Sequence, residues 1–318
     1  MSSLSNQPNF FIVGAAKAGT TSLYHYLAQH PEVYMSPIKE PNFFATDIDH
    51  EAIRPQVKER IRLLNIDQFL KGSMTNGIHR AFIRKPDDYN ALFRFANGKK
   101  AIGEASASYL FSQTAAQEIY KYNPDAKIII LLRNPVQRMY SHYLMDKRMA
   151  VTTLSFEDAL QEDKKNKVRK WAAASLYLEL GEYYNQVKRF KELFPAKNVL
   201  ILLSEELKSN PAETIRQVYK FLNIDDHFQP DFTREFNTAV VARNSLLQKI
   251  ISINYLRVKI RRFFKNTGLK KHIKQAVFTK PEEAQMPIET KIKYTEYYKS
   301  DILKLSELIQ KDLHKWIQ

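Results

Sequence analysis

The residues best suited to chemistry lie between Phe10 and Ser22, where a short apolar run meets a loop of small residues. The loop holds Gly14 and Gly19, with Lys17 between them, and leads into a helical pattern. Such a strand, loop and helix point free backbone N–H groups and the positive end of the helix dipole at one place, which suits a phosphate. Small residues let the backbone approach that anion closely. The predicted contacts are Ala16, Lys17, Ala18, Gly19, Thr20, Thr21 and Ser22.

The loop differs from the phosphate-binding loop of nucleotide kinases in two ways. The kinase pattern places a lysine directly after the second glycine, whereas Thr20 stands there in this chain and the lysine is Lys17, inside the loop. A kinase also holds magnesium, usually with an acidic residue at the end of a second strand. The second strong apolar run, Lys127–Leu132, ends in Arg133 instead. We therefore expect Arg133 to bind another phosphate without a metal, and keep a P-loop nucleotide kinase as the alternative enzyme.

These residues need a sheet that brings the ends of strands together. Short apolar runs, each followed by a helical pattern, predict an α/β fold with a central, mostly parallel sheet flanked by helices. We expect one domain over residues 1–318, with a variable insertion at about 45–86 and a basic, helical C-terminal region at about 238–318. The predicted strands are Phe10–Val13, Lys100–Glu104, Lys127–Leu132 and Asn198–Leu203, and the predicted helices are Thr20–Gln29, Asp88–Phe95, Gln113–Tyr122, Val136–Arg148, Leu176–Leu193, Pro211–Leu222 and one or two within Ile288–Trp316.

Two motifs together resemble a known family. The stretch Lys17–Leu23 is similar to the 5′-phosphosulfate loop of sulfotransferases that use 3′-phosphoadenosine 5′-phosphosulfate (PAPS), and Leu132–Tyr143 is similar to their 3′-phosphate motif. The pair resembles the bacterial and heparan-sulfate-type branch most. Lys39–Phe44 resembles the segment with the catalytic base, and Gly103–Leu110 resembles another family segment, in which proline is commoner than Ala107. The resemblance spans most of the chain, apart from roughly 47–86 and 245–280.

The resemblance implies which residues hold the nucleotide. Lys17 would donate to the 5′-phosphate and to the bridging oxygen, within a P-loop-like phosphosulfate-binding loop. Arg133 and Ser141 would hold the 3′-phosphate, since an arginine fork suits phosphate, and Arg138 would assist them. Ser106 would line the nucleotide side. No metal is expected.

The resemblance also implies the catalytic groups. Glu40 would act as the general base that takes the acceptor's proton, and Lys39 would touch the sulfuryl group. His25, His79 and His142 are kept as reserves, because some sulfotransferases use histidine for this step. The implied reaction moves the sulfuryl group from PAPS to a hydroxyl, with an amine less favoured, of a glycan or a small natural product. The sequence leaves the acceptor and the oligomeric state open.

Charge and composition narrow the partners. Lys and Arg number 49 against 34 Asp and Glu, which favours an anionic partner. Between Glu235 and Glu282 lie eleven of these cations and no acidic residue. The stretch 249–280 is open to three interpretations, namely a solvated helix face, a wall of the acceptor or 3′-phosphate cleft, and a weak membrane-surface contact. No nucleic-acid-binding motif is found, so a basic nucleic-acid-binding protein is the less favoured, non-enzymatic alternative.

The remaining composition concerns location. The chain contains no cysteine, which excludes disulfides and thiolate metal sites. Met1–Asn9 is polar and lacks the apolar core of a signal peptide, and no run reaches the ~18–20 apolar residues of a membrane span. We expect a cytoplasmic protein.

Overall fold

A computed structural model of the chain describes residues 6–149, 151–233, 241–242, 278–279 and 286–318. Its centre is a five-stranded sheet in the order β2-β3-β1-β4-β5, in which all neighbouring strands are parallel. The predicted α/β fold with a parallel central sheet is therefore confirmed. The five strands are β1 (Phe10–Gly14), β2 (Val33–Met35), β3 (Ala101–Ala105), β4 (Lys127–Leu132) and β5 (Val199–Leu203).

The central strands are apolar because helices cover both of their faces. All five residues of β1 are buried, and so are Ile128–Leu132 of β4. Strands buried on both faces show a continuous apolar run instead of alternation, and that run is what the sequence displayed. The edge strand β2 was not predicted, because three residues are too few to show a pattern.

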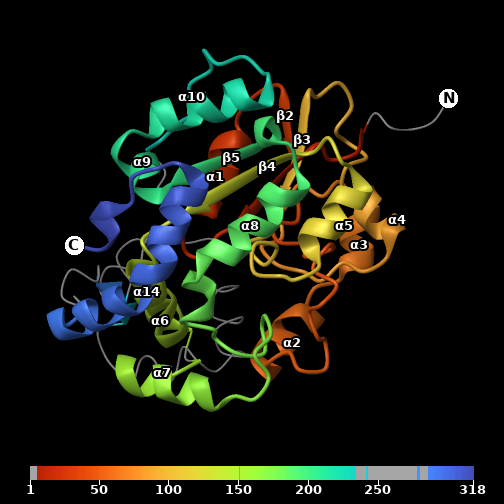
Figure 1. Cartoon of the computed structure of the whole chain (residues 1–318). Helices are drawn as coiled ribbons and strands as arrows, with labels where there is room; N and C mark the ends of the chain where they lie inside the picture. The colour runs from red at the N-terminus through yellow and green to blue at the C-terminus, as the bar shows by residue number, and fades with distance from the viewer. Residues whose placement is uncertain (1–5, 150, 234–240, 243–277, 280–285) are drawn as a thin grey trace.

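The helices lie in two layers (Figure 1). From β1 the chain reaches β2 through α1 (Thr20–Leu27), and from β3 it moves in the opposite direction to β4 through α5 (Ala115–Tyr122). Because such crossovers are right-handed, α1 and α5 lie on opposite faces of the sheet. The helix α10 (Pro211–Leu222) packs against α1, while α8 (Tyr183–Leu193) packs against both α5 and α14 (Ile288–Ile309).

This topology places a switch point at the carboxyl end of β1. The connections that follow β1 and β3 leave towards opposite edges of the sheet, so the loop after β1 lies where the strand order reverses. Open α/β sheets bind ligands at such a point, beyond the carboxyl ends of the strands. The β4 strand is the direct neighbour of β1, so Arg133 emerges beside the loop.

Several helices differ from the prediction. The stretch Leu176–Leu193 is not one helix, because Leu176 has a φ of 54° and a short 3-10 turn, η2 (Glu179–Gly181), precedes α8. The segment predicted as an insertion contains two short helices. The other elements are α2 (Pro55–Arg62), α3 (Ile66–Lys71), α4 (Pro86–Ala91), α6 (Pro135–Arg148), α7 (Phe156–Lys165), α9 (Ser204–Ser209), η3 (Ala196–Asn198), η6 (His314–Trp316) and an antiparallel pair, β6 (Val241–Ala242) with β7 (Phe278–Thr279).

The sequence predicts no membrane span and leaves the role of the basic stretch open. Across the described ranges, none of the helices has both the length and the apolar character needed to cross a bilayer. The basic stretch 249–280 lies almost wholly outside the described residues, so its three interpretations stay predictions.

Candidate functional site

The loop after β1 is shaped by its glycines. A Cβ atom on Gly14 would lie 2.5 Å from the Cβ of Leu110, so no larger residue fits there. Gly19 caps α1 with a φ of 111°, which glycine adopts without steric conflict. Lys17 also has a positive φ of 69°, an uncommon conformation for a residue with a side chain. The backbone thus turns tightly just before α1, whose first N–H groups have no partners within the helix.

The loop residues differ in how far ligands can reach them. The side chains of Ala18 and Thr20 are buried. Thr20 at the first turn of α1 therefore offers its backbone more readily than its hydroxyl. The partly exposed residues are Ala16, Lys17, Gly19, Thr21 and Ser22.

Lys17 and Arg133 meet at the carboxyl ends of β1 and β4. The Nη1 atom of Arg133 donates to the backbone oxygen of Lys17 at 3.2 Å, while its buried Nε has no hydrogen-bond partner. The Nζ of Lys17 lies 3.5 Å from the sulfur of Met145. Neither cation forms an ion pair within the described residues, so both remain able to take an anion.

Burial and neighbouring charge affect the protonation of Lys17. Burial lowers the pKa of its ammonium to about 8, and the nearby charges of Arg148 and Arg133 act in the same direction. The group is still mostly protonated at pH 7. A phosphate placed beside these cations would remove the repulsion between them.

The start of α6 holds Arg133 in place. Asn134 is the N-cap, and its Oδ1 accepts hydrogen bonds from the amides of Val136 and Gln137 at 3.0 and 3.1 Å. Pro135 occupies the first helical position, where its missing N–H is tolerated. The hydroxyl of Tyr183 donates to the Arg133 carbonyl at 3.0 Å. The predicted partner Ser141 lies farther along α6 and is partly exposed.

Glu40 is buried between two cations. Its Oε1 lies 3.2 Å from the Nζ of Lys39, and its Oε2 lies 2.8 Å from the Nε of Arg80. Burial by itself would raise the pKa of the Glu40 carboxyl, but the charges of Lys39 and Arg80 outweigh it and hold the pKa well below its usual range. Glu40 is therefore a carboxylate at neutral pH.

A network of buried polar groups fixes the backbone around Glu40. The Glu40 amide donates to the Ala105 carbonyl at 2.8 Å, and the Nδ2 of Asn42 donates to the Glu40 carbonyl at 2.7 Å. Ser106 accepts from the Asn42 amide at 3.1 Å, and Ser108 donates to the Asn42 Oδ1 at 2.6 Å. Ser106 was predicted to contact the nucleotide, but it is fully buried and already bonded. We therefore reassign it to positioning the Glu40 segment.

Arg138 is likewise turned into the protein. It is 0% exposed, and its guanidinium donates to the Tyr177 carbonyl and to the Nδ1 of His142. Its surroundings do not support the predicted phosphate contact, because a helix face buried against η2 and its preceding loop is closed to a ligand. Arg138 is a positioning residue that ties α6 to that loop.

The three reserve histidines occupy different surroundings. His142 accepts from Arg138 through Nδ1, and its Nε2 lies 3.8 Å from an oxygen of Asp146. Burial and the charge of Arg138 hold its pKa well below the usual range, so it is a poor base. His25 lies near enough to Lys39 to feel its charge, and the charge of His79 acts on Glu40.

Two further residues of these surroundings, Arg80 and Asp146, could not be recognised from the sequence. Arg80 belongs to the insertion, where no periodic pattern indicated how the chain returns to Glu40. The dense cations of 79–85 were the available signal. Asp146 lies in the helix that carries Arg138, and it accepts hydrogen bonds from Ser175 and Tyr177.

Comparison with known proteins agrees with this geometry. The family model described as "Sulfotransferase domain" matches residues 7–299, so the chain belongs to the sulfotransferase family. Carbohydrate sulfotransferase 15 of Mus musculus is 28% identical over 253 residues, which cover 68% of this chain and 44% of that protein. Bifunctional heparan sulfate N-deacetylase/N-sulfotransferase 3 of Homo sapiens is 26% identical over 224 residues, covering 70% of this chain and 23% of that protein.

A solved structure matches along the whole chain. The sulfotransferase from Alicyclobacillus acidocaldarius superimposes with a TM-score of 0.73 and 30% sequence identity, covering 98% of this chain and 99% of that one. By contrast, the chain spans less than half the length of the curated relatives named above. The family predicted from the two phosphate motifs is confirmed.

Proposed function

We propose that the protein transfers the sulfuryl group of PAPS to an acceptor hydroxyl, with an amine as the less favoured acceptor. The observation that carries the proposal is the contact between Arg133 and the Lys17 backbone. This contact brings Lys17 and Arg133 together at the carboxyl ends of the adjacent strands β1 and β4. Within the described residues neither cation has a carboxylate partner, and this edge of the sheet suits a phosphate. A nucleotide with phosphates at both its 5′ and 3′ positions would match this pair.

On the donor side, each residue has a distinct task. PAPS supplies the activated sulfuryl group when bound. Lys17, with its pKa lowered to about 8, donates a proton readily to an oxygen on which negative charge develops. The first N–H groups of α1, with Thr21 and Ser22, hold the 5′-phosphate. Arg133 and Ser141 hold the 3′-phosphate.

On the acceptor side, Glu40 takes the proton of the attacking hydroxyl. Its two ion pairs keep it ionised but also make it a weak base. Lys39, which pairs with Glu40, is also the cation that the negatively charged sulfuryl oxygens would attract. When Lys39 turns to them, one of the charges that lower the Glu40 pKa is withdrawn, and the carboxylate becomes more basic at the moment the proton must move.

The acceptor and the cellular location that the sequence predicts are also part of this proposal. The acceptor is a glycan or small natural product, as suggested by the carbohydrate-acting relatives named above. The cytoplasmic location and the lack of a metal requirement stay predictions, as does the role of the basic C-terminal region.

The decisive experiment is calorimetric titration with 3′-phosphoadenosine 5′-phosphate, the desulfated product, in EDTA. AMP and ATP serve as comparison ligands. We expect tight, metal-independent binding that prefers the 3′-phosphorylated nucleotide. The Arg133→Ala variant should bind it at least about tenfold more weakly, since one charge-assisted phosphate contact is worth about 1.5–3 kcal/mol.

The matched control is Arg62→Ala, which removes an exposed arginine of α2 that pairs with Glu59. It should bind like the wild type. Binding of ATP with magnesium alone, or an Arg133→Ala variant indistinguishable from the control, would contradict the proposal.

A further inference from the structure

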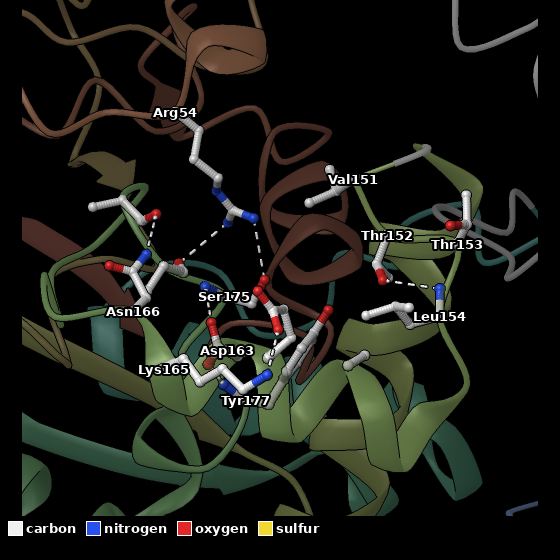
Figure 2. A pocket seen from close by; sticks show the side chains of 14 residues that line it. Arg54, Val151, Thr152, Thr153, Leu154, Asp163, Lys165, Asn166, Ser175 and Tyr177 are labelled. Carbon is white, nitrogen blue, oxygen red and sulfur yellow. Dashed lines mark hydrogen bonds and ion pairs between the residues drawn. The ribbon is translucent and has the colours of Figure 1, made fainter.

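A cavity of about 540 Å³ lies between Arg54 and the segments that follow α6 and α7 (Figure 2). Its lining comes from Arg54 before α2, from 151–154 after α6, from α7 and from the loop 166–177 that follows α7. We call it the Arg54 pocket. Its volume lies within the usual range for small-molecule sites, about 300–1,000 Å³.

The charges of the Arg54 pocket are all neutralised by partners. The guanidinium of Arg54 donates to the carbonyls of Ala172 and Ala174 and lies 3.9 Å from Asp146. The Glu162 carboxylate lies 3.1 Å from the Lys165 ammonium. Asp163 pairs with Arg169 at 3.1 Å, outside the lining. The lining thus holds two cations and two carboxylates and offers no unpaired cation to a sulfate or carboxylate.

The rest of the lining consists of hydroxyl, amide and small apolar groups. Thr152, Thr153, Ser175 and Tyr177 bring hydroxyls, and Asn166 brings an amide (Figure 2). Short aliphatic side chains, among them valine and alanine, lie between them. Such mixed walls match the two aspects of a sugar ring, whose edges carry hydroxyls and whose faces are apolar.

Asp146 bonds to the inner wall of the Arg54 pocket and lies near Lys17 of the phosphate loop. One oxygen of Asp146 accepts from the Ser175 hydroxyl at 2.6 Å and from the Tyr177 hydroxyl at 2.9 Å. The same carboxylate is close enough to Lys17 for its charge to raise the Lys17 pKa, against the larger effect of burial. It follows Met145, whose sulfur contacts the Lys17 ammonium.

The loop 166–177 makes a second connection. Ala174 lines the pocket and belongs to a small apolar cluster with Leu176 and Leu180. Ala16 of the phosphate loop packs against that cluster. Two residues of this loop, Ala172 and Leu176, have positive φ values of 64° and 54°. Backbone strain of this kind persists where the surroundings hold it in place, and Arg54 provides that hold through its bonds to the loop.

We propose that the Arg54 pocket is the acceptor site and that its ligand is an uncharged, hydroxyl-rich saccharide or glycoside, not a polyanionic glycan. The inference rests on the proposed sulfotransferase function. In the reaction, the saccharide hydroxyl oxygen bonds to sulfur as the bond between sulfur and the bridging oxygen breaks. The hydroxyl proton passes to Glu40, and the leaving phosphate oxygen keeps the bonding electron pair.

The first test compares acceptor classes with radiolabelled PAPS. The neutral probes are maltotriose and cellotriose, and the polyanionic probes are heparan sulfate and chondroitin sulfate. We expect labelling of the neutral saccharides only. Labelling of the polyanions alone, or of no probe although the desulfated nucleotide binds, overturns the inference.

The second test blocks the pocket. Thr153 is an exposed lining residue, so Thr153→Trp adds bulk with little risk to folding. The variant should raise the KM for the neutral saccharide by about tenfold or more and leave the Kd of the desulfated nucleotide within about twofold. Thr153→Ser should keep wild-type kinetics. The matched control is Gln117→Trp, at an exposed position of α5.

The outcomes separate the two proposals. If the wild type does not bind the desulfated nucleotide, the sulfotransferase function itself fails. If that nucleotide binds and Thr153→Trp shows the same acceptor KM as Gln117→Trp, the function stands and the Arg54 pocket is not the acceptor site.

Discussion

Two glutamates from neighbouring segments are buried in this protein, and their surroundings give them opposite charge states. The amide of Glu40 donates to the carbonyl of Ala105, the residue that follows Glu104. Glu40 has a cation at each oxygen. Glu104 is 0% exposed, and within the described residues neither of its oxygens has a well-aligned hydrogen-bond partner.

The surroundings of Glu104 are aromatic instead of cationic. Tyr89, Tyr109 and Tyr122 lie close enough for the Glu104 charge to raise their pKa values, in each case after the larger effect of burial. Burial raises the pKa of Glu104 to about 8, and only the nearby Tyr109 hydroxyl opposes it. At neutral pH the Glu40 carboxyl is thus ionised, while the Glu104 carboxyl is mostly protonated. Burial alone does not show that a carboxyl acts as a base, because the neighbouring groups decide whether it is ionised.

The largest expected effect separates the two glutamates by activity. Glu40→Gln removes the proposed proton acceptor and should lower kcat by about 10²–10⁴-fold, measured as sulfuryl transfer from PAPS. The Kd of the desulfated nucleotide should not change. Glu104→Gln is the matched comparison and should keep kcat within about threefold when assayed at pH 6, where the glutamate is protonated. Equal losses in both variants would mean that Glu40 has no special role.

The second expected effect is on stability, and it comes from the raised pKa of Glu104. The pKa of Glu104 is raised from 4.5 to about 8 on folding, so its contribution is complete below about pH 4.5 and is lost as pH rises to about 8. Each pKa unit corresponds to about 1.4 kcal/mol, so the free energy of unfolding of the wild type should fall by about 3–4 kcal/mol more than that of Glu104→Gln between pH 5 and pH 8.

Urea unfolding at several pH values measures this slope. Glu118→Gln, on the surface of α5, is the control and should follow the wild type, because its carboxylate is only paired with Lys121. Parallel slopes for the wild type and Glu104→Gln would show that Glu104 is ionised in the folded protein.

The third prediction concerns a variant in which the positive charge around Glu40 is reduced. Arg80→Met removes one of the charges that lower the Glu40 pKa, and leaves those of Lys39 and His79. A nearby opposite charge lowers the pKa of a carboxyl by about 1–3 units, so the acidic limb of the kcat profile should move up by about one unit or more. An Arg62→Met control should leave the limb in place. An unmoved limb in Arg80→Met would assign it to another group.

The smallest effect concerns Lys17, which, like Arg133, forms no ion pair with a carboxylate within the described residues. With its pKa near 8, the ammonium is lost as pH rises above that value. The affinity for the desulfated nucleotide should therefore fall by about tenfold between pH 7 and pH 9, since the phosphates are already ionised there. Calorimetry at stepped pH measures the fall. Lys17→Met should bind weakly at every pH without this transition, and Lys121→Met should retain it.

Local motifs predicted the strand, the turn and the helix starts that carry the predicted donor residues. The run Phe10–Ser22 combines a buried strand, a glycine-shaped turn and a helix start, all defined by neighbouring residues. Arg133-Asn134-Pro135 is similar, with a cap and a first-turn proline in sequence order. The order of the strands then follows from right-handed crossovers, so the meeting of Lys17 with Arg133 was foreseeable.

The surroundings of other side chains depend on distant neighbours. Ser106 and Arg138 have residue types suited to phosphate, yet one bonds to Asn42 and the other to Tyr177. The broken helix before α8 depends on a loop that Arg54 holds from more than a hundred residues away. No local pattern could reveal these contacts.

The sequence by itself therefore determined the class of fold, the phosphate loop and the family, since each rests on residues adjacent in the chain. Only the tertiary structure decided the charge states of Glu40 and Glu104, the buried hydrogen bonds of Ser106 and Arg138, and the Arg54 pocket. The physical reason is that burial and Coulomb interactions act through space, so the properties of a side chain depend on groups that folding brings to it.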